Sequence, residues 1–171
     1  MTNSLTQGDH HITTLVFLEN DNIIGDMTLP RVVLDTNVLV AASRSSRGAS
    51  FALLQALRDE RFIALLSVPL MLEYEAVLLR SEQLAASGRS PAMTQAFLDA
   101  LCLRGEAVHL HYLWRPQLRD PADEMVLETA LNGRADALVT LNVRDFVAAG
   151  RFRLKLTTPG AFYHQLREEY R

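Results

Sequence analysis

The stretch RVVLDTNVLVAAS, residues 31–43, decides how the sequence is interpreted. Its first apolar run, Val32 to Leu34, predicts a buried β-strand, and Asp35 follows this strand directly, with Asn37 inside a second apolar run. Burying a lone carboxylate costs several kcal/mol unless another group compensates for it. We therefore expect the rest of the sequence to supply partners for Asp35.

Length and composition indicate a globular chain of ordinary type. Its 171 residues suit one domain with a short extension, and 49% are hydrophobic and 22% charged. No apolar run reaches about 18 residues, so we expect no membrane span. The first 30 residues lack the pattern of a secretory signal, and Cys102 is the only cysteine, which excludes an internal disulfide and predicts a cytoplasmic protein. The formal net charge of −3 does not indicate an overall basic surface for binding nucleic acid.

Strand and helix patterns alternate from residue 31 onward. We treat residues 1–30 as an N-terminal extension without an assigned role, in which 10–19 resembles a strand, and 31–171 as the folded domain. The predicted strands are 31–35, 62–67, 107–113, 136–140 and 152–157, and the predicted helices are 48–60, 69–80, 91–103, 121–132, 143–149 and 161–169. This order predicts an α/β sandwich with a mainly parallel sheet. Ligands of such sheets bind beyond the carboxyl ends of the strands, where Asp35 and Thr140 are placed.

The predicted helix 69–80 carries two candidate acids. Glu73 and Glu75 lie on opposite flanks of its apolar stripe, equally far from the centre of the stripe. Periodicity alone does not choose between them.

The segment RDPADEMVLETAL, residues 119–131, carries further acids, of which three lie at its start. Asp123 falls within the apolar stripe of its helix, at the N-terminal end, while Glu124 lies on the flank. Asp120 and Asp123 are also spaced almost as in a capping box, which is a purely structural role. Two roles therefore remain open for Asp123, as a helix cap or as a ligand that faces the crevice above the sheet.

The segment LVTLNVRDF, residues 138–146, turns from a strand into a short element carrying Asp145. Asn142 could be only a turn residue and Asp145 only a solvated charge at a helix start. Taken jointly, however, four separate segments bring acids to one sheet edge, namely Asp35, Glu73, Asp123 and Asp145. Carboxylates held together must protonate or share a cation. Oxygen ligands select Mg²⁺ or Mn²⁺, ions that serve phosphodiester hydrolysis.

VVLDTNVLVAA, LEYEAVL, RDPADEMVLETAL and LVTLNVRDF, in this order, resemble the PIN-domain ribonucleases. The nearest branch is the VapC-like toxin component of toxin–antitoxin systems, and the resemblance covers residues 31–163. It implies a PIN-like α/β/α sandwich and a metal-dependent endoribonuclease that cleaves RNA. It also implies an inhibitory antitoxin partner and a homodimer or higher homo-oligomer.

The resemblance assigns roles to individual positions. It selects Glu73 over Glu75, because the family places its acid before the tyrosine of LEYEAVL. Many members have aspartate where this chain has Asn142, so we expect Asp145 to restore the missing charge. The full set of metal ligands implied is Asp35, Glu73, Asp123 and Asp145, with Asn142 and Glu124 as further ligands. Supporting roles are implied for Thr36, Asn37, Thr140 and Asp120. The candidate phosphate contacts are Arg44, Arg47, Arg119 and Arg144.

Other functions fit the sequence less well. A catalytically weakened PIN-like module that binds RNA or protein is favoured by Asn142 alone. A haloacid-dehalogenase-type phosphatase needs aspartate where the chain has Asn37. His109 and His111 alternate on one face of a predicted strand but lack a third metal ligand at matching spacing. Neither a Gly-x-Ser-x-Gly elbow nor a phosphate-binding glycine loop occurs.

Overall fold

The computed structural model describes residues 28–113 and 115–169. The strand expected at 10–19, like most of the proposed extension, lies outside these residues. In the described part, no helix is long and apolar enough to cross a membrane.

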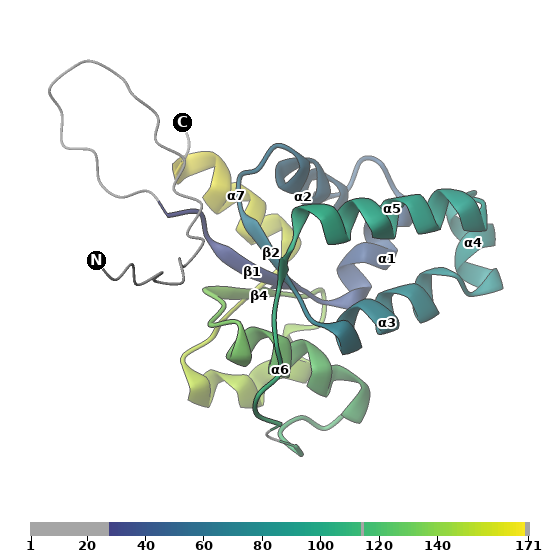
Figure 1. Cartoon of the computed structure of the whole chain (residues 1–171). Coiled ribbons are helices and arrows are strands. Elements are labelled where there is room, and N and C mark those ends of the chain that lie inside the picture. Colours follow the sequence, from purple (N-terminus) through teal and green to yellow (C-terminus); the bar gives the residue numbers. More distant parts are fainter. Residues whose placement is uncertain (1–27, 114, 170–171) are drawn as a thin grey trace, which may run out of the picture.

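A five-stranded, all-parallel sheet forms the centre of the molecule (Figure 1). Its strands are β1 (Arg31–Leu34), β2 (Ile63–Leu66), β3 (Glu106–Ala107), β4 (Ala137–Val139) and β5 (Lys155–Thr157), in the order β3-β2-β1-β4-β5. Strand β1 is central, pairing Leu34 with Val139 on one side and Val32 with Ala64 on the other. The chain order therefore reverses beside β1, and such a switch point is where open α/β sheets bind ligands.

Helices cover the sheet on both sides. They are α1 (Thr36–Arg44), α2 (Ala49–Arg58), α3 (Val68–Leu78), α4 (Ser81–Ser87), α5 (Pro91–Arg104), α6 (Glu124–Asn132) and α7 (Pro159–Glu169), with 3₁₀ segments η1 (Pro121–Asp123) and η2 (Val143–Phe152). Helices α2 and α7 pack together, while α6 packs on β1 and β2 from the other side (Figure 1). The expected α/β sandwich is confirmed.

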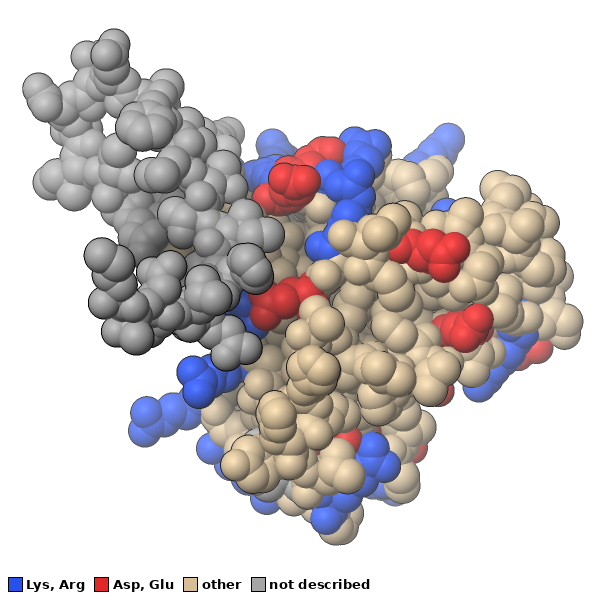
Figure 2. All heavy atoms as spheres, viewed as in Figure 1, with Lys and Arg blue, Asp and Glu red and all other residues tan. Residues whose placement is uncertain are grey.

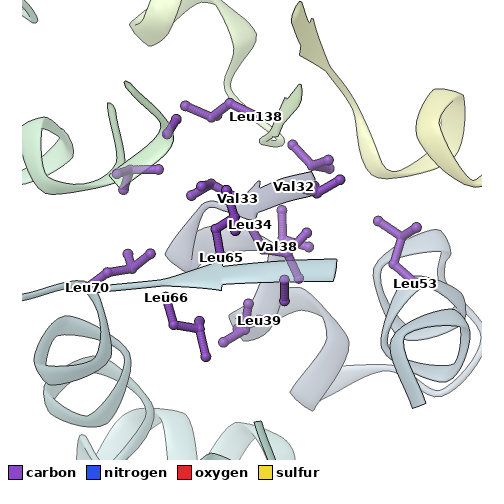
Figure 3. Packing of buried hydrophobic residues seen from close by; sticks show 14 of the residues in the cluster. Val32, Val33, Leu34, Val38, Leu39, Leu53, Leu65, Leu66, Leu70 and Leu138 are labelled. Atoms are coloured by element: carbon purple, nitrogen blue, oxygen red, sulfur yellow. The ribbon is translucent and has the colours of Figure 1, made fainter. Parts of the chain in front are cut away.

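The hydrophobic core is built around β1. Val32 and Val33 are fully buried, as is Leu138 on the neighbouring strand β4 (Figure 3). Val38 and Leu39 of α1 are also fully buried in this cluster. Burial of each such side chain is worth about 1.5–3 kcal/mol, which fixes β1 firmly and with it the residue that follows it.

Two helices were not predicted, and one strand is shorter than predicted. The apolar run after Asp35 forms helix α1, because Val38, Leu39 and Ala42 recur at helical spacing on its buried side. Helix α4 occupies a segment in which no helix was expected. The strand expected over 107–113 is reduced to Glu106–Ala107, since the following residues leave the sheet and bind α6 instead.

Candidate functional site

Asp35 lies buried at the carboxyl end of β1, with only 4% of its surface exposed. Its Oδ2 accepts hydrogen bonds from Thr140 Oγ1 at 2.6 Å and from Asn37 Nδ2 at 2.5 Å. Burial raises the pKa of the Asp35 carboxyl above its ordinary value, although these hydrogen bonds oppose the rise. The partners that the sequence had to supply for Asp35 are thus Thr140 and Asn37.

The same two side chains tie the ends of β1 and β4 together. Asn37 Oδ1 accepts a hydrogen bond from Leu141 N at 3.1 Å, and Thr140 Oγ1 accepts one from Asn142 N at 2.9 Å. These bonds fix the start of α1 against the loop that leads into η2. Asn37 and Thr140 thus both lie beside Asp35, and their supporting role at a metal site stays a prediction.

Helix α3 is attached to β1 through Tyr74, which the sequence analysis treated only as part of an apolar stripe. The buried Tyr74 hydroxyl donates a hydrogen bond to the Leu34 carbonyl, immediately before Asp35. Burial raises the pKa of Tyr74 well above its ordinary value, and the Asp35 charge adds to the rise. A tyrosine in a buried stripe needs a partner for its hydroxyl, and that requirement is the signal that could have revealed this contact.

The two candidate acids of α3 face different surroundings. The Glu73 charge acts on the carboxyl of Asp123, at the sheet edge. Glu75 instead lines a separate pocket of about 380 Å³, together with Asp99 and Cys102 of α5. Of the two acids, Glu73 is the one whose charge acts on Asp123, and its role as a metal ligand stays a prediction.

Asp123 is the point at which the acids converge. Its pKa is raised to about 6, first by burial and then, in decreasing order, by the charges of Asp35, Asp120, Asp145 and Glu73. These carboxylates come from β1, α3, η2 and the segment around η1, so only the fold brings them into one electrostatic field. The competing capping role belongs to Asp120, whose Oδ1 accepts a hydrogen bond from Ala122 N at 2.9 Å, whereas Asp123 makes no capping bond to α6.

These donors fit a hard divalent cation in chemical type but are not yet arranged around one. All of them are carboxylate or amide oxygens, and the mutual repulsion expressed in the raised pKa of Asp123 is what a cation relieves. Within residues 28–113 and 115–169, no three His, Cys, Asp or Glu side chains are placed so that they could hold a metal ion as they stand. Binding would require these carboxylates to move closer together.

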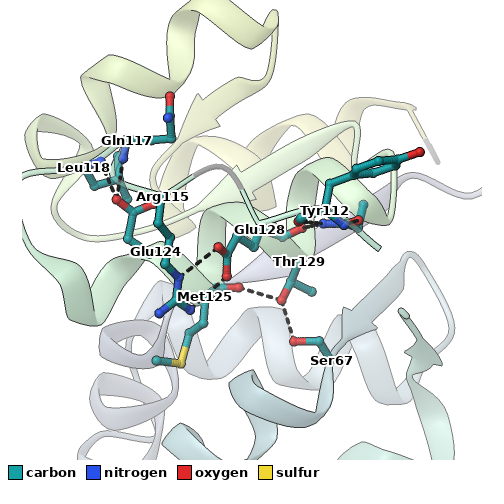
Figure 4. Close-up of polar contacts among 10 residues, drawn as sticks. Ser67, Tyr112, Arg115, Gln117, Leu118, Glu124, Met125, Glu128 and Thr129 are labelled. Atoms are coloured by element: carbon teal, nitrogen blue, oxygen red, sulfur yellow. Dashed lines mark hydrogen bonds and ion pairs between the residues drawn. The ribbon is translucent and has the colours of Figure 1, made fainter. Parts of the chain in front are cut away.

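Glu124, a further expected ligand, faces away from these acids. It is 2% exposed, and its Oε1 accepts hydrogen bonds from Gln117 N at 2.5 Å and Leu118 N at 2.8 Å (Figure 4). Its Oε2 is buried without a hydrogen-bond partner in the described part of the chain. The side chain thus holds the loop before η1.

The four candidate phosphate contacts fall into two groups. Arg44 donates to Gln83 Oε1 through Nε at 2.9 Å and through Nη2 at 2.5 Å, which engages its guanidinium with α4. Arg47, Arg119 and Arg144 are exposed, and within the described residues their side chains form no hydrogen bond or ion pair.

Comparisons with known proteins agree with this architecture. A family model described as PIN domain matches residues 31–144. A similar solved structure is the crystal structure of VapBC2 from Rickettsia felis bound to a DNA fragment from their promoter, in which a chain superposes with a TM-score of 0.53. The two chains are 20% identical, and the match covers 75% of this chain and 98% of that chain, which shows a shared fold. No curated protein is similar enough in sequence to count as a relative.

Proposed function

Because the chain belongs to the PIN domain family, whose members are typically nucleases that bind divalent metals, we propose that it is a Mg²⁺- or Mn²⁺-dependent endoribonuclease. The observation that carries this proposal is the field around Asp123, where burial and the charges of Asp35, Asp120, Asp145 and Glu73 raise the cost of ionising this one carboxyl. The capping bond of Asp120 does not account for this convergence, because repulsion between acids destabilises the fold without a cation.

We assign the ion to Asp35, Glu73, Asp123 and Asp145. The backbone amide of Asn142 donates to Thr140, and the Asn142 side chain can add an uncharged amide oxygen to the ligands of the ion. A bound divalent ion would neutralise the charge of a phosphate and lower the pKa of an attacking water. Thr140 and Asn37 orient the Asp35 carboxylate, and Tyr74 holds the helix that carries Glu73 against β1.

The partner we propose is an antitoxin, with this chain as the toxin of a type II toxin–antitoxin pair. Support comes from the fold shared with a chain of the VapBC2 complex, which is bound to a DNA fragment from its promoter. A small open reading frame beside the gene would encode this antitoxin. Its co-expression should relieve growth inhibition by this chain, and failure to do so would remove the toxin part of the proposal.

Metal dependence tests the nuclease directly. With millimolar Mn²⁺ or Mg²⁺ the protein should cleave single-stranded RNA and unfold at a higher temperature, because the ion binds only the folded state. EDTA should abolish both effects. Asp35→Asn should abolish cleavage while the circular dichroism spectrum stays native, and cleavage retained by this variant would refute the assignment.

A second function, binding RNA or a protein without cleavage, is favoured by two observations. Asn142 replaces an acid, and the described carboxylates do not form a ready metal cluster. RNA binding without cleavage and without any thermal shift at millimolar metal would establish this alternative.

A further inference from the structure

Between β3 and η1, the connector described over residues 109–113 and 115–120 leaves the sheet and is hydrogen-bonded to α6 at several points (Figure 1). At the C-terminal end of α6, Asn132 Oδ1 accepts hydrogen bonds from His111 N at 3.0 Å and Tyr112 N at 3.1 Å. Asn132 Nδ2 also donates to the Tyr112 carbonyl at 3.0 Å. One side chain thus fixes two consecutive residues of the connector through their backbone.

Two further side chains of α6 continue this attachment. Glu128, only 1% exposed, accepts two hydrogen bonds from Arg115, from Nε and Nη2, each at 2.9 Å. One turn further toward the N-terminus, Glu124 accepts the backbone amides of residues 117 and 118 (Figure 4). Spaced four residues apart, Glu124, Glu128 and Asn132 share one face of α6. The connector therefore runs antiparallel to α6 over eight residues, about 12 Å at the helical rise per residue.

The outer side of the connector presents flat side chains to solvent. Tyr112 is 67% exposed, and in Figure 4 its ring points away from the contacts that hold its backbone. His109 and His111 are exposed as well, with ring centroids 6.4 Å apart. The Arg115 side chain keeps 47% of its surface exposed while Glu128 holds its guanidinium in place. The connector backbone is thus held on α6, while the rings of its side chains and the guanidinium of Arg115 face solvent.

The connector runs toward the candidate site. Tyr112 lies at the C-terminal end of α6, and from there the connector continues past Glu124 to the segment that contains Asp120 and Asp123. A strand lying on the connector would be led toward the convergent carboxylates. Spanning about 12 Å, the connector has room for about two nucleotides of an extended single strand.

The charges indicate which part of a nucleic acid would be held. The face on which the connector lies is mostly uncharged, with scattered rather than clustered Lys and Arg (Figure 2). The charge of Arg115 is compensated by Glu128, so this residue offers its plane more than its charge. Stacking of bases on rings and guanidinium planes is the contact that such a surface can make.

We propose that the exposed side chains of His111, Tyr112 and Arg115 form a base-stacking track for single-stranded RNA that leads the strand to the carboxylate edge. This proposal rests on the proposed ribonuclease function and identifies where its substrate docks. The attachment to α6 orders the track before RNA arrives, so little conformational entropy is lost on binding.

Binding without cleavage tests the track separately from catalysis. The probe is a fluorescein-labelled single-stranded oligoadenylate, compared by anisotropy in EDTA with an abasic ribose-phosphate strand of equal length. Tyr112→Ala and His111→Ala should each weaken oligoadenylate binding about fivefold or more and leave abasic binding unchanged. His164→Ala, at an exposed histidine on α7, is the matched control and should change neither.

A purely structural role for Tyr112 predicts different results. It would lower the unfolding temperature of Tyr112→Ala and weaken both ligands equally, whereas a stacking role predicts that Tyr112→Trp restores oligoadenylate binding. Unchanged affinity in both alanine variants, equal losses for the two ligands, or no oligoadenylate binding by the unaltered protein would each overturn the track, the last pointing to a protein partner instead.

Cleavage assays then separate this proposal from the proposed function. In Mn²⁺, Tyr112→Ala should raise KM and leave kcat unchanged, because the ring contacts substrate far from the reacting phosphate. If the unaltered protein binds oligoadenylate through the track but does not cleave RNA in Mn²⁺, the ribonuclease proposal fails and the track stands.

Discussion

Glu124 and Asp123 are neighbours in the chain, but they belong to two sets of carboxylates whose surroundings are opposite. Buried Glu128 is held by Arg115, and one oxygen of buried Glu124 accepts two backbone amides. Asp123 has no such donors, and its pKa rises to about 6, first because of burial and then because of the charges of other acids, chiefly Asp35. Buried acids that meet N–H donors hold the fold together, whereas acids that meet one another need a ligand.

The strongest test of this comparison is Asp123→Asn. Cleavage should fall about a hundredfold or more, the scale of losing one preorganised electrostatic contact. Without metal at pH 7.5, however, the variant should unfold at a higher temperature than the unaltered protein, because one repelling charge is gone. Calorimetry and an RNA cleavage assay measure the two effects. A variant that loses stability would place Asp123 among the structural acids instead.

Glu128→Ala should behave in the opposite way. Breaking a buried ion pair typically costs 3–5 kcal/mol, and since Arg115 is half exposed we expect about 3 kcal/mol in urea unfolding. The rise in unfolding temperature on adding Mn²⁺ should be preserved, because Glu128 lies outside the convergent acids. Loss of that rise would show that the two sets of carboxylates are coupled.

The raised pKa of Asp123 gives a pH dependence with a definite sign. The folded state holds the proton more tightly than the unfolded state, so this group stabilises the fold below pH 3.8 and loses that contribution as pH rises through about 6. Without metal, the unfolding temperature of Asp123→Asn relative to the unaltered protein should therefore increase from pH 4 to pH 7. The Mn²⁺-induced rise should be larger at pH 7.5 than at pH 5, and a pH-independent rise would contradict the assignment.

The smallest expected effect concerns Thr140. Replacing it by valine keeps the shape but removes a hydrogen bond to the Asp35 carboxylate. Losing such a contact to a metal ligand should weaken Mn²⁺ binding about tenfold, measured by titration calorimetry. Ser43→Ala on α1, whose hydroxyl bonds only its own helix, serves as the control and should leave the Mn²⁺ affinity unchanged.

Much of the fold could be predicted because its signals are local. The apolar runs of β1, β2 and β4 and the helical periodicity of α3 and α6 are present in the sequence itself. Helix α1 was missed because a single apolar run fits strand and helix equally well, and its burial against the core decides between them. The predicted strand 107–113 ends early because Asn132 binds the backbone of His111 and Tyr112, which holds this part of the chain on α6 instead of at the sheet edge.

By itself, the sequence determined that acids follow apolar runs at several separate positions, and therefore that Asp35 required partners. Only the tertiary structure decided what those partners are and how neighbouring acids differ. It gave Asp35 the hydroxyl of Thr140, brought Asp123 within the field of Glu73 and left Glu75 in another pocket. Periodicity along one helix defines a face but not what packs on it, and the charge state of a carboxylate depends on groups that are distant in the chain.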